Sequence, residues 1–323
     1  MVSHEKYVPG FDWVRLIGSI LVVLTHFGFF EQAYAASPIR YRMFAVLVPV
    51  FFMMSGFLRK NHFSKKLVFK QVIKYWVIYL AIDYFTVLYT HYMLWRATGE
   101  FDFARVAGYL LKGLVCNYGH SIQLWFIPAL IYPMLLNAFL NDKTRKIVIA
   151  VAAVLLVFSS SMGDERLSNW LNEMLSSFPA INGDITGQGL ATRSRRALTG
   201  LLFTTVGFDI DTWKVKPEWL ILAAVAFGII EFSTCYLGVA AILLSILCFY
   251  LVKWLPGQFL CPYHMEISLF SCLMFFMHIF EKDLFHHITD SLPLNFFLIL
   301  VFNLVITFAV SSLIRSKRQT VNI

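Results

Sequence analysis

The stretch FDWVRLIGSILVVLTHFGFF, from Phe11 to Phe30, decides the fold class of this chain. It is apolar apart from a few residues, and a helix of this length rises about 30 Å, which matches the hydrocarbon core of a bilayer. No small-residue cleavage pattern follows closely, so the stretch does not resemble a removable signal peptide. We therefore expect it to form the first transmembrane helix.

The composition of the whole chain is that of an integral membrane protein. Of the 323 residues, 59% are hydrophobic and only 14% are charged, and the mean hydropathy is +0.68. Soluble domains carry about 25% charged residues. The net charge of +8 does not indicate nucleic-acid binding, because the basic residues occur in short clusters between apolar runs, as in cytoplasmic loops of membrane proteins.

The apolar runs predict an all-α fold, a polytopic integral membrane helix bundle with about ten transmembrane helices. The expected spans are residues 11–30, 39–57, 69–89, 124–140, 147–161, 196–208, 219–231, 233–253, 266–280 and 295–313. The sixth and seventh are the least secure because they are short. The sequence shows no internal repeat, so residues 1–323 are predicted to form one membrane domain.

Cysteine spacing gives no sign of a metal site. The five cysteines form no CxxC pair, and most lie within or beside apolar segments. Neither a disulfide framework nor a zinc site is indicated, and we predict no bound metal.

The distribution of basic residues predicts the orientation of the helices. With a cytoplasmic N-terminus, every short, strongly basic connection falls on the cytoplasmic side, as the positive-inside rule requires. The C-terminus is then cytoplasmic as well, and the longer connections at residues 91–123 and 162–195 face the exterior, where an acceptor can bind. The basic residues concerned are Arg59, Lys60, Lys65, Lys66, Lys70, Lys143, Arg145, Lys146, Lys214, Lys216, Arg315, Lys317 and Arg318.

Arg15 and His26 share one face of the first predicted helix, because their separation of eleven residues returns the helix to within about 20° after three turns. They lie roughly 16 Å apart along the axis, about half of the hydrocarbon core. An arginine there costs about 2.5 to 3.5 kcal/mol, so Arg15 either forms a local ion pair with Asp12 and reaches toward water, or binds an anion such as a phosphate. His26 is either a hydrogen-bonded histidine at the interface or a general base for a hydroxyl group that attacks an acyl carbonyl.

This pattern resembles the acyltransferase-3 family of membrane O-acyltransferases. In that family the first helix carries an acidic residue, then an arginine, ten further residues and a histidine, which here are Asp12, Arg15 and His26. Four more segments resemble the family in the expected order: VPVFFMMSGFLRK (48–60), LWFIPAL (124–130), TRSRRALTGLLFTTVGF (192–208) and SLFSCLMFFMHIF (268–280). The chain is also similar to the membrane domain of vancomycin-resistance serine racemases, which is associated with moving serine.

The resemblance implies that acyl-CoA, usually acetyl-CoA, is bound from the cytoplasm as co-substrate. Arg15, with Lys66 and Lys70 in the basic loop, would hold its phosphates or its pantetheine arm, and His26 would act as general base near the outer end. Two features depart from the family. Gln123 stands where a histidine often precedes the Leu-Trp pair, and lysines, which lack the forked geometry of arginine, follow the second helix.

Two further positions matched by the resemblance each have two interpretations. Ser55 and Gly56 end the second predicted span, where they serve either close helix packing or the stabilisation of the thioester oxyanion through a hydroxyl group and backbone donors. Trp125 is either an aromatic residue of the membrane interface or a platform for the bound donor.

A third group of candidate residues concerns the acceptor. Arg193, Arg195 and Arg196 form a positive cluster on the predicted outer side, against the charge rule, and Arg193 best matches a Thr-Arg pair of the family. The cluster either pairs with acids of the same connection or binds an anionic acceptor, such as a lipid-linked or phosphorylated glycan. The acids that could pair with the cluster are Asp164, Glu165, Glu173 and Asp184.

His278, in the last matched segment, is either a buried, hydrogen-bonded histidine or a substrate contact.

The leading hypothesis from the sequence is a bacterial inner-membrane O-acyltransferase that acetylates a hydroxyl group of a cell-envelope glycan or a related acceptor. The runner-up is a transporter for a small solute such as serine, although no fused cytoplasmic racemase accompanies the membrane segments. A third hypothesis is a membrane-embedded assembly subunit whose polar groups bind only lipid headgroups. The fold alone does not name the acceptor.

Overall fold

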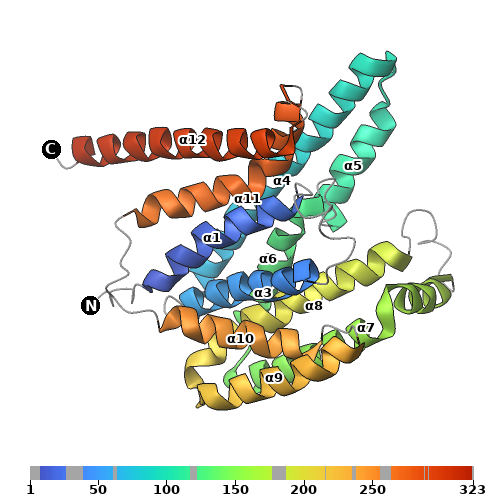
Figure 1. Ribbon diagram of the computed structural model, residues 1–323. Coiled ribbons are helices and arrows are strands. Elements are labelled where there is room, and N and C mark those ends of the chain that lie inside the picture. Colours follow the sequence, from blue (N-terminus) through green and yellow to red (C-terminus); the bar gives the residue numbers. More distant parts are fainter. Residues whose placement is uncertain are drawn as a thin grey trace. The chain divides into compact units, whose positions relative to one another are not determined.

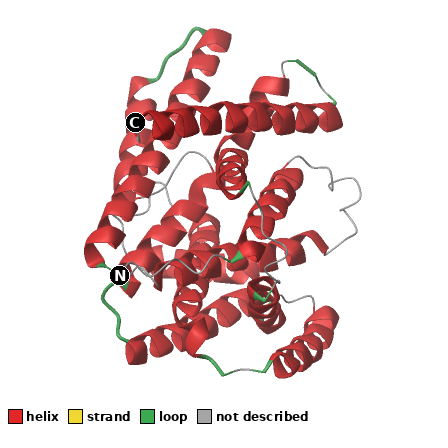
Figure 2. Cartoon of the chain, turned by 90° about the vertical axis from the view of Figure 1, so that its left-hand side faces the viewer, coloured by secondary structure: helices red, strands yellow, loops and turns green. Residues whose placement is uncertain are grey.

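The computed structural model describes residues 8–26, 39–60, 64–116, 122–176, 187–214, 216–234, 238–254, 263–286, 288–289 and 291–321. Every regular element among these residues is a helix, and Figure 2 shows no strand among them. The predicted all-α fold is therefore confirmed for this part of the chain.

Figure 1 shows the helices of the described residues, labelled in chain order. Two of them are short 3₁₀ turns, named η1 and η3, and the others are α-helices. Their bounds are α1 Pro9–His26, α3 Ile39–Lys60, α4 Lys65–Thr98, α5 Phe103–Cys116, η1 Ile122–Trp125, α6 Phe126–Asn137, α7 Asp142–Ser176, α8 Gly187–Asp209, η3 Ile210–Thr212, α9 Pro217–Thr234, α10 Val239–Lys253, α11 His264–His286 and α12 Leu292–Val321.

Among the described residues, 3 stretches are long and apolar enough to cross a membrane: Lys65–Thr98, Asp142–Met162 of α7 and Pro293–Ser316 of α12. Only 17%, 11% and 22% of their most apolar windows are buried inside the protein. Apolar surface of this kind is stable in contact with lipid and unfavourable in water. These helices indicate a membrane protein, and the other predicted spans stay predictions.

The two long connections predicted outside the membrane contain much helix. α4 continues past Tyr89 because no glycine or proline interrupts it before Gly99, which adopts a φ of 75° and donates its N–H to the carbonyl of Trp95 at 2.7 Å. α7 likewise runs on to Ser176, and α8 already begins at Gly187. Apolarity located the centres of these helices, but their polar ends are set by breakers and contacts.

The chain divides into two compact units, one made of Met1–Leu47 with Tyr250–Ile323 and the other of Val48–Phe249. Each is described by itself. The single membrane domain remains a prediction.

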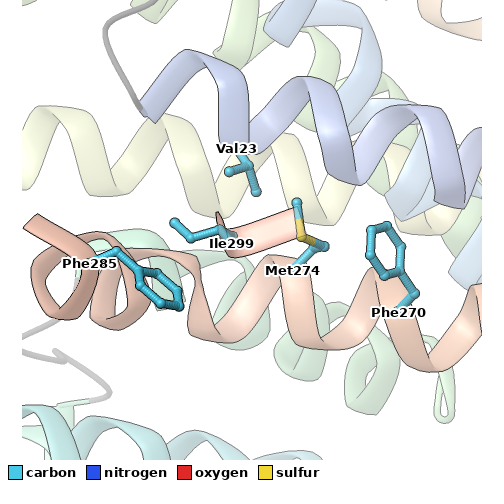
Figure 3. Close-up of a cluster of buried hydrophobic side chains, with 5 residues drawn as sticks. All are labelled: Val23, Phe270, Met274, Phe285 and Ile299. Carbon is cyan, nitrogen blue, oxygen red and sulfur yellow. The ribbon is translucent and has the colours of Figure 1, made fainter. Parts of the chain in front are cut away.

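In the first unit, α11 packs against both α1 and α12. Val23 of α1 points toward Met274 of α11 and Ile299 of α12, and Phe270 and Phe285 complete this buried cluster (Figure 3). α11 and α12 run antiparallel, since α11 is bonded near its start to the end of α12 through the Glu266–Arg315 ion pair. The packing fixes the three helices side by side.

In the second unit, helices approach one another at glycines. A Cβ atom added at Gly56 of α3 would collide with the carbonyl oxygen of Thr204 on α8. One added at Gly207 of α8 would collide with the carbonyl oxygen of Met53 on α3, and Gly200 has the same relation to the backbone of α6. Small residues let helix backbones pack closely in membranes, where dispersion contacts replace the hydrophobic effect. The structure thus supports the packing role of Gly56.

We predict that Gly56→Ala and Gly207→Ala each destabilise the protein by about 1 to 3 kcal/mol, because the added methyl group meets backbone atoms of a neighbouring helix. Gly108 of α5 is the matched control, since a Cβ atom there meets nothing within 4 Å. Gly108→Ala should be neutral or stabilise by up to about 1 kcal/mol through helix propensity. Thermal unfolding of the purified variants in detergent measures the difference, and equal Tm values for all three would contradict the close approach.

Candidate functional site

The polar face of α1 contains an ion pair in the first unit. Arg15 donates from Nη1 to Oδ1 of Asp12 at 3.1 Å, and the side chains are 31% and 2% exposed, respectively. The local pair inferred from the sequence is therefore present. It uses one of the five guanidinium donors, and no other hydrogen bond of Arg15 is found within the described residues.

The same face of α1 is directed into the protein. Arg15 and His26 belong to one uninterrupted helix, so their backbone positions share a face as predicted. Ser19 and Val22, which lie between them on that face, are 2% and 4% exposed. The Ser19 hydroxyl donates to the carbonyl of Leu16 at 3.0 Å. His26 is the last residue of α1, and its side chain lies outside the described residues.

Ser55 lies within α3, which continues to Lys60, three residues beyond the predicted end of the span at Phe57. Its hydroxyl group donates to the carbonyl of Phe51 at 2.9 Å, a common hydrogen bond for a serine inside a helix. Backbone N–H groups at this position belong to the helix ladder. Ser55 therefore offers a hydroxyl oxygen as acceptor, whereas the expected backbone donors are engaged.

Trp125 and Arg196 come together in the second unit, although the sequence assigned them to different ligands. The guanidinium carbon of Arg196 lies 5.1 Å from the centroid of the Trp125 ring. Phe52 of α3 packs against the rings of Trp125 and Phe126, with centroid distances of 6.2 Å and 4.4 Å, respectively. A cation held over an indole is stabilised by the ring quadrupole, most strongly away from water.

The arginines of α8 do not stand in a loop. Arg196 is 13 residues before Asp209, the last residue of α8, which corresponds to a rise of about 20 Å. Arg195 donates to the carbonyl of Ser159 on α7. The side chain of Arg193 and those of the four acids predicted to pair with the cluster lie outside the described residues. Arg195 and Arg196 are thus helix residues that contact α7 and Trp125.

Three predicted basic connections meet at one end of the second unit. Lys65, at the start of α4, lies with its Nζ 5.1 Å from the ring centroid of Phe139, just after α6. Arg145, at the start of α7, donates from Nε to Oδ1 of Asp209, at the end of α8, at 2.8 Å. The exposed lysines at this end, here called the basic end, are Lys66, Lys70, Lys143, Lys146, Lys214 and Lys216.

His278 is fully buried in α11 of the first unit. Its Nδ1 lies 2.7 Å from the carbonyl of Met274 and 3.0 Å from that of Phe275. Because carbonyl oxygens only accept, Nδ1 carries a hydrogen. The buried, hydrogen-bonded histidine is the arrangement present.

Two buried polar residues of the first unit, Glu281 and Asn303, were not singled out from the sequence. Glu281 of α11 is 1% exposed, and Asn303 of α12 is 0% exposed. Asn303 donates from Nδ2 to Oε2 of Glu281 at 2.6 Å. Glu281 follows the predicted ninth span directly and was treated as part of a connection, although an asparagine inside the apolar tenth span was a signal that it needs a partner.

We predict an energetic coupling between Trp125 and Arg196 of about 0.5 to 2 kcal/mol, the range of cation–π contacts. A double-mutant cycle with Trp125→Leu and Arg196→Gln, read from thermal unfolding in detergent, measures it. The matched control cycle combines Trp125→Leu with Arg195→Gln, because Arg195 has its partner on α7. Equal coupling in both cycles would refute a specific contact.

Comparison with known proteins gives no relative: no protein-family model, curated protein or solved structure matches the chain at the significance threshold applied. The functional assignment therefore depends on the residues and contacts described above.

Proposed function

We propose that the protein is a membrane O-acyltransferase that moves an acyl group, in the first instance acetyl, from cytoplasmic acyl-CoA to a hydroxyl group of a cell-envelope glycan or related acceptor. The observation that supports this most is the Asp12–Arg15 ion pair on the inward face of α1, the face that also carries position 26. A charged pair inside an apolar helix is expensive and is usually retained for function. The resemblance to acyltransferase-3 proteins rests on the same residues.

Arg15 is the proposed donor-binding residue. Asp12 neutralises part of its charge, so Arg15 can remain in an apolar bundle, while its remaining N–H groups are available for a phosphate or a carbonyl oxygen of the pantetheine arm. Lys66 and Lys70 are exposed at the basic end and are the proposed contacts for the phosphates of the donor.

His26 is the proposed general base. It removes the proton of the acceptor hydroxyl as the oxygen attacks the thioester carbonyl carbon, which forms a tetrahedral oxyanion. Collapse of that intermediate breaks the C–S bond, and the imidazolium returns the proton to the departing thiolate. Base catalysis of this kind contributes about 10² to 10⁴ in rate.

The acceptor side is proposed to involve Trp125 and Arg196. An indole face offers apolar contact to a sugar ring, and the partly buried guanidinium over it offers donors to an anionic group. Arg193 remains a proposed acceptor contact from the sequence, and His278 is the buried, hydrogen-bonded histidine of α11.

We further propose about ten spans in a bacterial inner membrane, with both termini in the cytoplasm. The gathering of three basic connections at the basic end supports a common side for them, as the positive-inside rule requires.

The orientation predicts a labelling pattern. In a cysteine-free background, Lys143→Cys and Lys216→Cys should react with a membrane-impermeant maleimide only after the membrane is opened. Glu100→Cys, just beyond the far end of α4, is the control and should react in intact cells. The reverse pattern would require the opposite orientation.

For activity, we predict that His26→Ala lowers acetyl-CoA turnover by about 10² to 10⁴ at unchanged donor affinity, since it removes only the base. Arg15→Ala should weaken donor binding instead. Asp12→Asn/Arg15→Ala is the matched control, because it does not leave the buried carboxylate without its cation.

The measurement uses purified protein in sealed proteoliposomes with radiolabelled acetyl-CoA and candidate glycans. Turnover that does not depend on His26, or Arg15→Ala protein that is folded and binds the donor normally, would overturn the respective assignment. Movement of a small solute such as serine across the vesicles without any acyl donor would favour the transporter, for which buried polar groups in membrane helices are equally characteristic.

A further inference from the structure

The pair of Glu281 and Asn303 between α11 and α12 has a hydrogen-bonding problem. Nδ2 of Asn303 donates to Oε2 of Glu281 at 2.6 Å and to the carbonyl of Ile299 at 2.9 Å, so both amide hydrogens are used. Oε1 of Glu281 and Oδ1 of Asn303 are buried and have no hydrogen-bond partner within the described residues. Two acceptor oxygens on two joined side chains thus have no donor.

Turning the amide of Asn303 does not remove the problem. In the turned position Oδ1 would face the Glu281 carboxyl group and the carbonyl of Ile299, which are both acceptors. The donor that is missing must therefore come from elsewhere.

One added proton satisfies both oxygens. A carboxylic acid and a primary amide form a cyclic pair, in which the amide N–H donates to one carboxyl oxygen and the acid O–H donates to the amide oxygen. The first of these two bonds is present, and its two side chains carry the two oxygens that need a donor. We propose that Glu281 is a proton-binding site within the membrane protein, and that Asn303 holds it as a neutral carboxylic acid.

The other buried acid of the same helix provides the contrast. Glu266 of α11 is paired with Arg315 of α12, a cation that stabilises the ionised carboxylate. Glu281 faces a neutral amide in the same pair of helices. Within the part of the chain that the structure describes, an ionised Glu281 would be a buried charge whose side-chain partner is a neutral amide, which is far less stable than a neutral acid in such a place.

The ionisable residues of α11 and of the two helices packed against it bear on the charge of Glu281. Between Leu292 and Ile314, α12 has none. The ionisable residues of α11 within one turn of Glu281 are His278, Lys282 and Asp283, and His286 ends the helix. On α1, which packs against α11, they are Asp12, Arg15 and His26.

The site has a consequence for how the helices move. Release of the proton leaves a carboxylate and an amide oxygen facing each other, which favours separation of α11 from α12 or entry of water between them. Proton binding thus stabilises the packed form of this helix pair. This inference does not depend on acyl transfer.

The test compares Glu281→Gln with Glu266→Gln in the full-length protein in proteoliposomes. A glutamine at 281 reproduces the neutral acid, because its amide can make both bonds with Asn303, whereas a glutamine at 266 abolishes an ion pair. At neutral pH we expect E281Q to keep or raise Tm, because glutamine makes the same bonds without taking up a proton, and E266Q to lower Tm by several degrees. If E281Q lowers Tm as much as E266Q does, Glu281 is ionised and the proposal is wrong.

Infrared spectroscopy gives an independent measurement. The wild type should show the carbonyl stretch of a protonated carboxylic acid at neutral pH, and E281Q should lack that band. The folded protein then binds a proton that the unfolded chain releases above its ordinary carboxyl range, so Tm of the wild type should fall relative to E281Q as pH rises. Identical infrared spectra of the two proteins, or a wild-type Tm that rises relative to E281Q with pH, would overturn the proposal.

Discussion

A charged or polar side chain buried in an apolar helix bundle is costly without a partner, and this constraint organises the structure. Asp12 and Arg15 satisfy each other on α1. Glu266 pairs with Arg315, and Glu281 with Asn303, so two contacts that each contain a buried acid join α11 to α12. The two pairs between α11 and α12 also fix the register of these helices, because a shift of one turn would separate buried Glu266 and Glu281 from their partners.

Close backbone packing is the second constraint, and it acts in the second unit. Gly56 and Gly207 let α3 and α8 approach so closely that no side chain fits between them, and Gly200 does the same for α8 and α6. In lipid, where hydrophobic association between helices is absent, such contacts are a main source of packing energy. They also set where Trp125, at the start of α6, meets Arg196 of α8.

The Asp12–Arg15 pair and the Arg196–Trp125 contact suggest different chemical tasks. The Asp12–Arg15 pair leaves guanidinium N–H groups for the anionic donor that we propose, because Asp12 uses only one of them. The Arg196–Trp125 contact combines a flat apolar face with donors, as a glycan acceptor requires. Glu281 differs from both, since its neutral partner favours a proton instead of a charged ligand.

The sequence by itself determined the helical class, the membrane character and the local chemistry of α1. Those properties depend on apolarity and on residues within a few turns of each other, such as Asp12 and Arg15, whose spacing requires only one helix. It also predicted individually that Gly56, Trp125 and Arg196 matter.

Only the tertiary structure decided which residues meet across helices. Nothing in the spacing of Trp125 and Arg196, or of Glu281 and Asn303, reveals that they touch. The tertiary structure also decided that Arg195, which the sequence placed in the connection before the sixth span, lies within α8, where it donates to the carbonyl of Ser159 on α7. The physical reason is that a partner for a buried polar group is chosen by packing between helices, whereas apolarity and periodicity are local.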